Sequence, residues 1–137
     1  MRGTVCIGGF EIESQYIATE LTAILSHAQG LLARIDKDTA DTAVLKEFII
    51  CAYALHELML AHEFNEFCDI FVFLQNALQI YEERNSPIDP DFRKILEQFL
   101  IFVNNFYDAI VSGIDPVILI EEKKVLCFLI KNISIIT

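Results

Sequence analysis

Apolar residues recur every three or four positions through long stretches of this chain, and few residues interrupt them. In the first stretch these positions are Ile12, Tyr16, Ile17, Leu21, Ile24, Leu25, Ala28, Leu31, Leu32 and Ile35. This spacing places the apolar side chains on one face of a long helix. An all-β chain needs turn residues about every 8–12 positions, but the 137 residues include only five glycines and three prolines. The pattern therefore predicts an all-α fold.

Further amphipathic segments follow the first. We expect the residues that face the core to be Leu45, Phe48, Ala52, Leu55 and Met59 in the second segment, Phe67, Ile70, Phe71, Leu74, Leu78 and Tyr81 in the third, and Phe92, Ile95, Leu96, Phe99, Val103, Phe106 and Ile110 in the fourth. The last segment, 117–137, is very apolar and predicts a fifth helix, although its β-branched isoleucines have a lower helix propensity.

Local start and stop signals separate these segments. Asp89-Pro90 and Asp115-Pro116 each combine an N-cap residue with a proline at the first helical position. Gly113 ends the fourth segment, and the periodicity resets around residues 62–65. Asp41 or Thr42 is the expected N-cap of the second helix.

These boundaries leave short connections, which favour antiparallel neighbours. We expect an antiparallel up-and-down four-helix bundle over residues 11–112. An irregular N-terminus, 1–10, precedes it and ends at Gly8-Gly9, and an additional C-terminal helical segment, 113–137, follows it.

The charge of the chain narrows the range of partners. Ten basic and twenty acidic residues give a net charge of −10, which argues against binding to nucleic acid or to an anionic membrane surface. This charge permits a basic protein partner. No signal peptide and no uninterrupted apolar run of membrane-spanning length is evident, so we expect a cytoplasmic protein.

The sequence shows no established pattern for catalysis or for metal binding. Phosphate-binding loops, dinucleotide fingerprints and nucleophile elbows are absent. His56 and His62 are six residues apart, which does not suit a helical metal pair, and no Glu-x-x-His occurs. We expect no cofactor, no metal and no enzymatic activity. The four widely spaced cysteines (Cys6, Cys51, Cys68 and Cys127) suggest reduced thiols, with a disulfide framework or a cysteine metal site as the alternative.

The stretch 48–64 resembles the second helix of histidine phosphotransfer domains, including the phosphotransfer module of chemotaxis histidine kinases. That helix reads apolar-apolar-x-small-small-His-x-Leu-Lys-Gly, with a Phe eleven residues after the His. Here Cys51-Ala52 match the small pair, Leu55 matches the Leu and Phe64 matches the Phe. The resemblance covers roughly residues 11–111, in helix pattern more than in identities, and implies a four-helix bundle that takes part in phosphorelay signalling.

Three positions depart from the family pattern. Tyr53 stands where the phosphoacceptor His belongs, His56 at the Lys position and Glu57 at the Gly position. A phenol is a poor substitute for an imidazole nucleophile at neutral pH. A carboxylate about 4 Å from a phosphoryl group repels it by about 1 kcal/mol per charge even in water. The resemblance therefore implies a degenerate version that does not accept phosphate.

A second register is also open. If His56 is the acceptor, Phe67 falls eleven residues later, and Met59 and Leu60 replace the Lys and the Gly. Tyr53 and His56 lie about one helical turn apart, so both registers implicate the same surface. We expect partner-binding residues at Tyr53, His56, Glu57 and Leu60.

Three functional hypotheses follow. The first is a non-catalytic docking module for a receiver or histidine kinase domain, and the second is an active phosphotransfer intermediate that uses His56. The third is a structural oligomerisation protein, for example a homodimer joined through the C-terminal segment. The apolar runs 117–120 and 125–130 in that segment need a covering surface. In the plainest interpretation, Tyr53 and His56 are ordinary surface residues.

Overall fold

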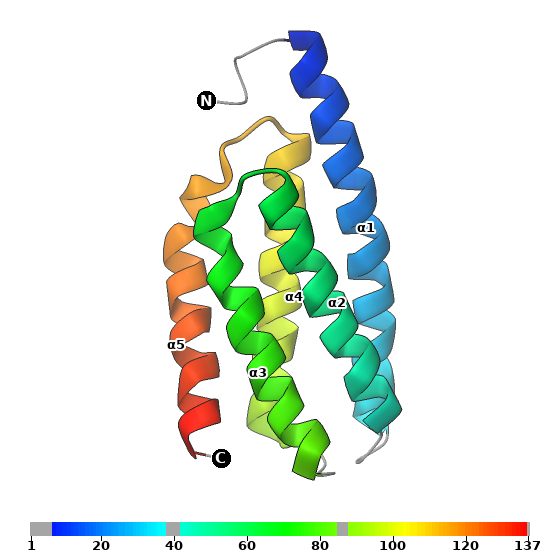
Figure 1. Cartoon of the computed structure of the whole chain (residues 1–137), viewed down its shortest axis with the longest axis vertical. Helices are drawn as coiled ribbons and strands as arrows, with labels where there is room; N and C mark the ends of the chain where they lie inside the picture. Colours follow the sequence, from blue (N-terminus) through cyan, green and yellow to red (C-terminus); the bar gives the residue numbers. More distant parts are fainter. Residues whose placement is uncertain (1–6, 38–41, 85–87, 137) are drawn as a thin grey trace.

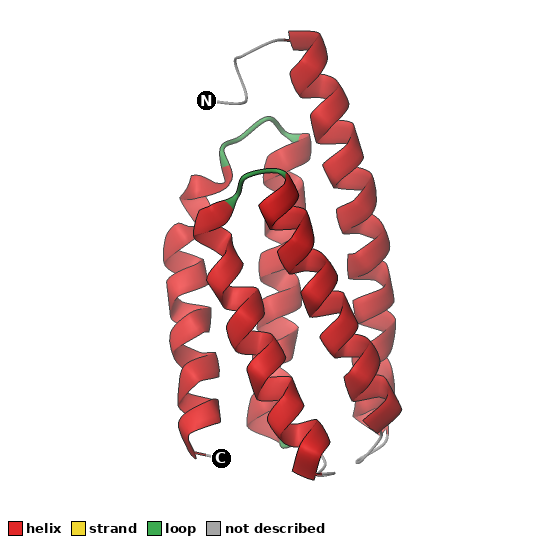
Figure 2. Cartoon of the chain, viewed as in Figure 1, coloured by secondary structure: helices red, strands yellow, loops and turns green. Residues whose placement is uncertain are grey.

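The structure is a computed structural model that describes residues 7–37, 42–84 and 88–136 (Figure 1). Within these ranges the chain forms five α-helices and no strand, which confirms the all-α prediction (Figure 2). The helices are α1 (Ile7–Lys37), α2 (Thr42–Ala61), α3 (Cys68–Arg84), α4 (Pro90–Val111) and α5 (Ile120–Ile136), and the short 3-10 helices η2 (Asn65–Phe67) and η3 (Pro116–Leu119) precede α3 and α5. Consecutive helices run in opposite directions (Figure 1).

The predicted N-caps of the later helices are confirmed. The Asp89 side chain accepts hydrogen bonds from the backbone N–H of Phe92 at 2.8 Å and from the Tyr81 hydroxyl at 2.5 Å. Asp115 accepts a hydrogen bond from the backbone N–H of Val117 at 3.0 Å. These carboxylates satisfy donors that have no partner within the first helical turn.

The start of α1 differs from the prediction. The helix begins at Ile7 and passes through Gly8 and Gly9, where an irregular N-terminus was expected. A glycine disfavours a helix interior by about 1 kcal/mol relative to alanine, but each residue added to an existing helix gains a hydrogen bond. At the start of α2, Thr42 is the first helical residue, while Asp41 lies outside the described residues.

The predicted core residues of the second, third and fourth segments are all buried. In α1 the predicted stripe is buried or half-buried from Ile17 to Ile35, and Ile12 falls outside the side chains that the structure describes. Tyr16 is the exception, with 66% of its surface exposed. The reason is its direction: the next residue, Ile17, is 2% exposed, so α1 is already covered at this level, and Tyr16 lies about 100° around the helix from it, off the inward stripe. The first turns of α1 extend beyond α2 and α4 (Figure 1).

Helix α5 is part of the bundle, so the expected four-helix bundle with an additional C-terminal helix is instead, over the described residues, an arrangement of five helices. The five helices form a closed ring in the order α1, α2, α3, α5, α4, so α5 lies between α3 and α4 and runs antiparallel to α4 (Figure 1). Its residues Leu126, Cys127 and Ile130 are buried in the same core as the other four helices. The segment 117–133 therefore packs on its own chain through one face.

Aromatic rings fill the space between α3 and α4. The Cα atoms of these two helices stay more than 8 Å apart throughout the described residues. The Phe67 ring meets that of Phe106 edge to face at 5.1 Å and lies 6.1 Å from that of Phe102. Phe71 meets Phe99 at 5.7 Å. This aromatic seam, made of Phe67, Phe71, Phe99, Phe102 and Phe106, holds the two helices together where their backbones do not touch.

A buried lysine fastens α5 to the start of α3. The Lys123 Nζ donates hydrogen bonds to the Glu66 carbonyl oxygen at 2.9 Å and to the Asp69 carboxylate at 3.1 Å. Only 10% of the Lys123 side chain is exposed, against 48% of the Asp69 side chain. The ammonium group is thus largely removed from water and depends on these two acceptors.

Replacement of glycine by alanine should change the free energy of unfolding in opposite directions at two positions. Gly113 has a φ of +72°, and Gly30 lies inside α1; a Cβ at either position would meet nothing within 4 Å. Gly113→Ala should lower the free energy of unfolding by about 1–2 kcal/mol, because alanine disfavours the left-handed region. Gly30→Ala should raise it by about 0.5–1 kcal/mol through helix propensity. Denaturant unfolding followed by circular dichroism measures both, and a shift of the same sign in the two variants would contradict the backbone explanation.

Candidate functional site

The inward stripe of α2 determines which of its residues reach the surface. Phe48, Ala52, Leu55 and Met59 are each about 1% exposed, so the opposite side of the helix faces outward. The α2 docking face, which we define as Tyr53, His56, Glu57 and Leu60, lies on the outward side and its edge. Tyr53 is 55% exposed and Leu60 46%, while Glu57 is exposed and His56 half-buried. The structure thus places all four predicted residues at the surface.

One apolar residue beside this face was missed. Ile50 is 65% exposed and stands three residues before Tyr53, on nearly the same side of the helix. Its neighbour Ile49 is half-buried. The two isoleucines look alike in sequence, and only their positions relative to the inward stripe distinguish them. Ile50 extends the apolar surface around Tyr53 by about one helical turn.

The α2 docking face borders α3. Lys46 of α2 and Glu82 of α3 form an ion pair at 3.7 Å, which shows that these two residues lie at about the same level of the antiparallel pair. His56 lies ten residues after Lys46 in α2, and Val72 lies ten residues before Glu82 in α3. Because the two helices are antiparallel, these equal steps lead to the same level. The imidazole of His56 therefore lies near the level of Val72, which is itself 37% exposed. A partner that covers Tyr53 and His56 would also meet the exposed side of α3.

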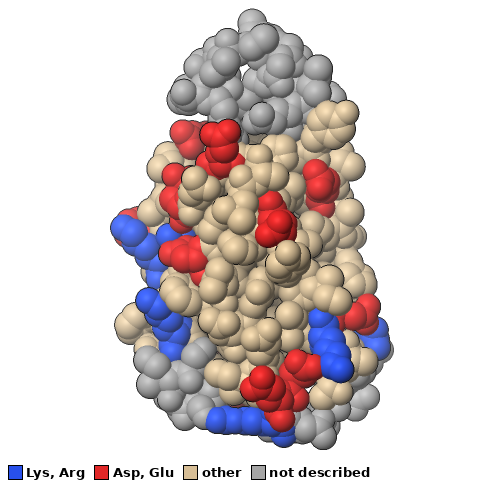
Figure 3. All heavy atoms as spheres, in the orientation of Figure 1, with Lys and Arg blue, Asp and Glu red and all other residues tan. Residues whose placement is uncertain are grey.

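Charge is unevenly distributed around this face. On the side of α2 that borders α1, the Glu47 carboxylate pairs with His27 at 3.6 Å and with Arg34 at 3.7 Å. Figure 3 shows Lys and Arg side chains near the lower end of the molecule and along the edge over α5, while the middle of the face over α2 and α3 carries none. The centre of the candidate surface is therefore apolar and acidic.

Little around His56 would activate it as a nucleophile. Within the described residues its side chain makes neither a hydrogen bond nor an ion pair, whereas an activated nucleophile or base is normally oriented by a third group. Its neighbour Glu57 is exposed and is the residue that would repel a phosphoryl group. The arrangement suits contact with a partner better than covalent chemistry.

The described cysteines are free thiols that are poorly suited to catalysis. Burial raises the pKa of the Cys51 thiol to about 11, with a smaller contribution from Glu47. Burial also raises the pKa of Cys127 to about 11, with Asp69 adding to the shift. Because only the thiolate is a strong nucleophile, both residues stay protonated and unreactive near neutral pH. Cys68 is half-buried, and Cys6 lies outside the described residues.

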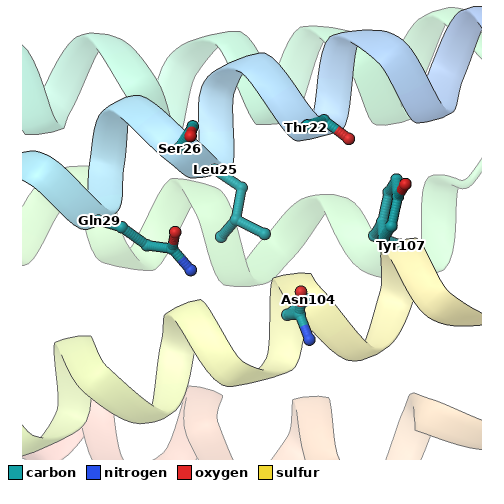
Figure 4. Close-up of a pocket in the computed structure, with 6 residues that line it drawn as sticks. All are labelled: Thr22, Leu25, Ser26, Gln29, Asn104 and Tyr107. Atoms are coloured by element: carbon teal, nitrogen blue, oxygen red, sulfur yellow. The ribbon is translucent and has the colours of Figure 1, made fainter.

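A shallow pocket of about 210 Å³ lies between α1 and α4 (Figure 4). Its lining is uncharged and consists of Thr22, Leu25, Ser26, Gln29, Asn104 and Tyr107. In Figure 4 the Leu25 and Gln29 side chains extend from α1 toward α4, and Tyr107 extends from α4 toward α1. The pocket offers hydrogen-bonding groups but no paired acid and base, so its residues do not form a catalytic set.

The described residues hold neither a metal-binding cluster nor a membrane-spanning helix. No three His, Cys, Asp or Glu side chains there come together in a way that could hold a metal ion. No helix in the described ranges is both long enough and apolar enough to cross a membrane.

Comparison of the chain with models of protein families, with curated proteins and with solved structures gives no match.

Proposed function

We propose that this bundle is a signal-transduction module similar to histidine phosphotransfer domains, and that it docks a receiver or histidine kinase domain without accepting phosphate. The contact surface is the α2 docking face together with the adjacent side of α3. Such a module would act in the cytoplasm, where it would compete for, or recruit, a phosphorelay partner. The observation that carries the proposal is the exposed phenol of Tyr53 at the position of the phosphoacceptor.

The burial pattern of α2 supports this alignment. The small pair Cys51-Ala52 is buried directly before Tyr53, at 5% and 1% exposure. Phe64, eleven residues after Tyr53, is also buried, and its ring meets Phe106 edge to face at 5.1 Å. Phe67, eleven residues after His56, is buried as well, so this position alone does not choose between the registers. The greater exposure of Tyr53 favours the first register.

The chemistry of the face supports docking over phosphotransfer. Half-exposed Tyr and Leu side chains supply apolar contact area, and tyrosine is enriched among the residues that dominate binding energy. Glu57 places a carboxylate one turn from Tyr53, where a phosphoryl group would need a cation or a bare backbone. The face can thus bind a protein surface while repelling the phosphoryl group itself.

Binding to receiver and kinase domains tests the docking role. The full chain is titrated against a panel of purified receiver domains and histidine kinase domains from the same organism, and association is followed by interferometry. At least one domain should bind saturably, and Tyr53→Ala should weaken that binding about 30-fold, as expected for a central aromatic contact. The matched control is Tyr16→Ala on α1, which removes an equally exposed tyrosine and should leave binding unchanged.

If no domain binds, or if Tyr53→Ala and Tyr16→Ala have the same effect, the proposed face is wrong.

Incubation with phosphoramidate, followed by intact mass measurement, tests the claim that phosphate is not accepted. The chain should gain no phosphoryl group, since its only imidazole near the acceptor position lies beside Glu57. A mass gain that disappears in His56→Ala would contradict the proposal and establish the phosphotransfer alternative. Glu57→Gly provides a further comparison, because it restores the bare backbone of the family pattern at this position.

A further inference from the structure

A second apolar surface lies on the side of the bundle formed by α4, η3 and α5. We call it the α5 face, and it consists of Ile101, Ile114, Val117, Ile118, Val125 and Phe128, each between 48% and 65% exposed. Ile101 of α4 and Val125 of α5 line one groove of about 260 Å³, with Gln98, Glu122 and Leu126 completing it. This surface shares no residue with the α2 docking face.

The size of this surface suits a protein interface. At roughly 100 Å² of exposed surface each, the six side chains offer about 600 Å², most of the roughly 800 Å² that each partner buries in a standard interface. Monomeric proteins rarely leave a larger apolar patch in water. Removal of this apolar surface from water would favour association strongly.

The charge of α5 bears on which partner the α5 face can bind. Between Ile120 and Ile136 there are three lysines and two glutamates, whereas each of the other four described helices has more acidic than basic residues. Two copies of a chain with a net charge of −10 repel each other least where acidic charge is not in excess. Figure 3 shows both basic and acidic side chains along the edge over α5.

The order of charges along α5 is also self-complementary. The segment reads Glu121-Glu122-Lys123-Lys124, acidic residues first and basic residues second. If two α5 helices pair antiparallel about a twofold axis between residues 122 and 123, Glu121 of each copy lies opposite Lys124 of the other. Within one chain these two side chains pair with each other at 3.2 Å, and with 85% and 63% of their surface exposed both can exchange that contact for the one across the twofold axis. The same pairing brings Phe128 opposite Val117 of the second copy.

We propose that the α5 face binds a second copy of this chain and forms a twofold-symmetric dimer with antiparallel α5 helices. The inference goes beyond the docking role, because the two surfaces lie on different helices. A dimer of this kind leaves both α2 docking faces open, so that one assembly presents two binding surfaces to its partners.

Sedimentation velocity over a range of concentrations tests the dimer. The wild-type chain should reach twice the monomer mass of 15.6 kDa, and Val125→Lys should weaken dimerisation about 100-fold or more, because both copies would bury an unpaired ammonium group. This variant makes the chain less acidic, so greater long-range repulsion cannot explain the loss. Ile50→Lys on α2 introduces the same side chain at an equally exposed isoleucine and should dimerise like the wild type.

Charge exchange tests the orientation of the helices. Glu121→Lys and Lys124→Glu should each weaken the dimer about tenfold, since each breaks two symmetry-related ion pairs, and the double exchange should restore it. Circular dichroism of every variant verifies that it is folded. A wild-type chain that is monomeric at all concentrations, or a dimer that survives Val125→Lys, overturns the proposal; failure of the double exchange to restore dimerisation overturns the antiparallel arrangement.

Discussion

Phe67→Ala should lower the free energy of unfolding by about 3–5 kcal/mol, the range for truncating a fully buried phenylalanine. Phe67 has no measurable exposure and lies in the aromatic seam against Phe102 and Phe106. Because the backbones of α3 and α4 stay apart, neither helix can move in to fill the cavity without disturbing its other neighbours. The loss should therefore fall toward the upper end of the range.

Guanidinium unfolding followed by circular dichroism measures this loss, since the chain has no tryptophan. Phe67→Leu should cost less than about 2 kcal/mol, because it retains most of the buried volume. Tyr16→Ala, which truncates a residue that is 66% exposed, should change stability by no more than about 0.5 kcal/mol. A loss below about 2 kcal/mol in Phe67→Ala would show that the seam collapses easily and does not hold α3 to α4.

The ion pair between α3 and α5 gives the second large effect. Asp69→Ala should lower the free energy of unfolding by about 2 kcal/mol, because it leaves the largely buried Lys123 ammonium with the Glu66 carbonyl as its remaining acceptor. This value lies below that of a fully buried pair because about half of the Asp69 side chain reaches water. Lys123→Met should cost less than about 1 kcal/mol, since it removes the buried charge and keeps the packed stem.

The double variant with Lys123→Met and Asp69→Ala shows how much of the loss in Asp69→Ala comes from the ion pair with Lys123. In the Lys123→Met background, Asp69→Ala should cost little, because no unpaired charge then remains. The matched control is Lys46→Ala, which breaks the pair between the 67% exposed Lys46 side chain and Glu82 at 3.7 Å and should have an effect below about 0.5 kcal/mol. Equal losses for Asp69→Ala and Lys46→Ala would contradict the burial argument.

Features that depend on neighbouring residues could be predicted from the sequence. Asp89 and Asp115 were identified as N-caps because the capping residue and its proline are adjacent in the chain, and Gly113 because a left-handed residue ends a helix. The exposure of Tyr53 follows from its position off a stripe that repeats every three to four residues. The candidate face could therefore be located before the fold was known, although the choice between Tyr53 and His56 as the aligned acceptor was not settled there.

Features that depend on distant residues could not be predicted. Lys123 and Lys124 are adjacent and chemically identical, yet the side chain of one is 10% exposed and that of the other 63%. Lys123 shares the inward face of α5 with Leu126, Cys127 and Ile130, and the carboxylate that accepts its hydrogen bond there belongs to Asp69, which lies 54 residues earlier in the chain. The position of α5 between α3 and α4 also depends on residues that are distant in the sequence, because the side chains of all three helices must pack together. The helical pattern shows that α5 is amphipathic but not which helices it touches.

The place of α5 in the ring also has a consequence for how the chain is made. A ribosome releases α3 and α4 before the 17 residues of α5, so the nascent chain passes through a stage in which one side of its phenylalanine-rich interior is open to water. At that stage we expect the growing polypeptide to bind chaperones and to be prone to aggregation. Once α5 has followed α3 and α4 out of the ribosome, it shields the interior and ends that exposure.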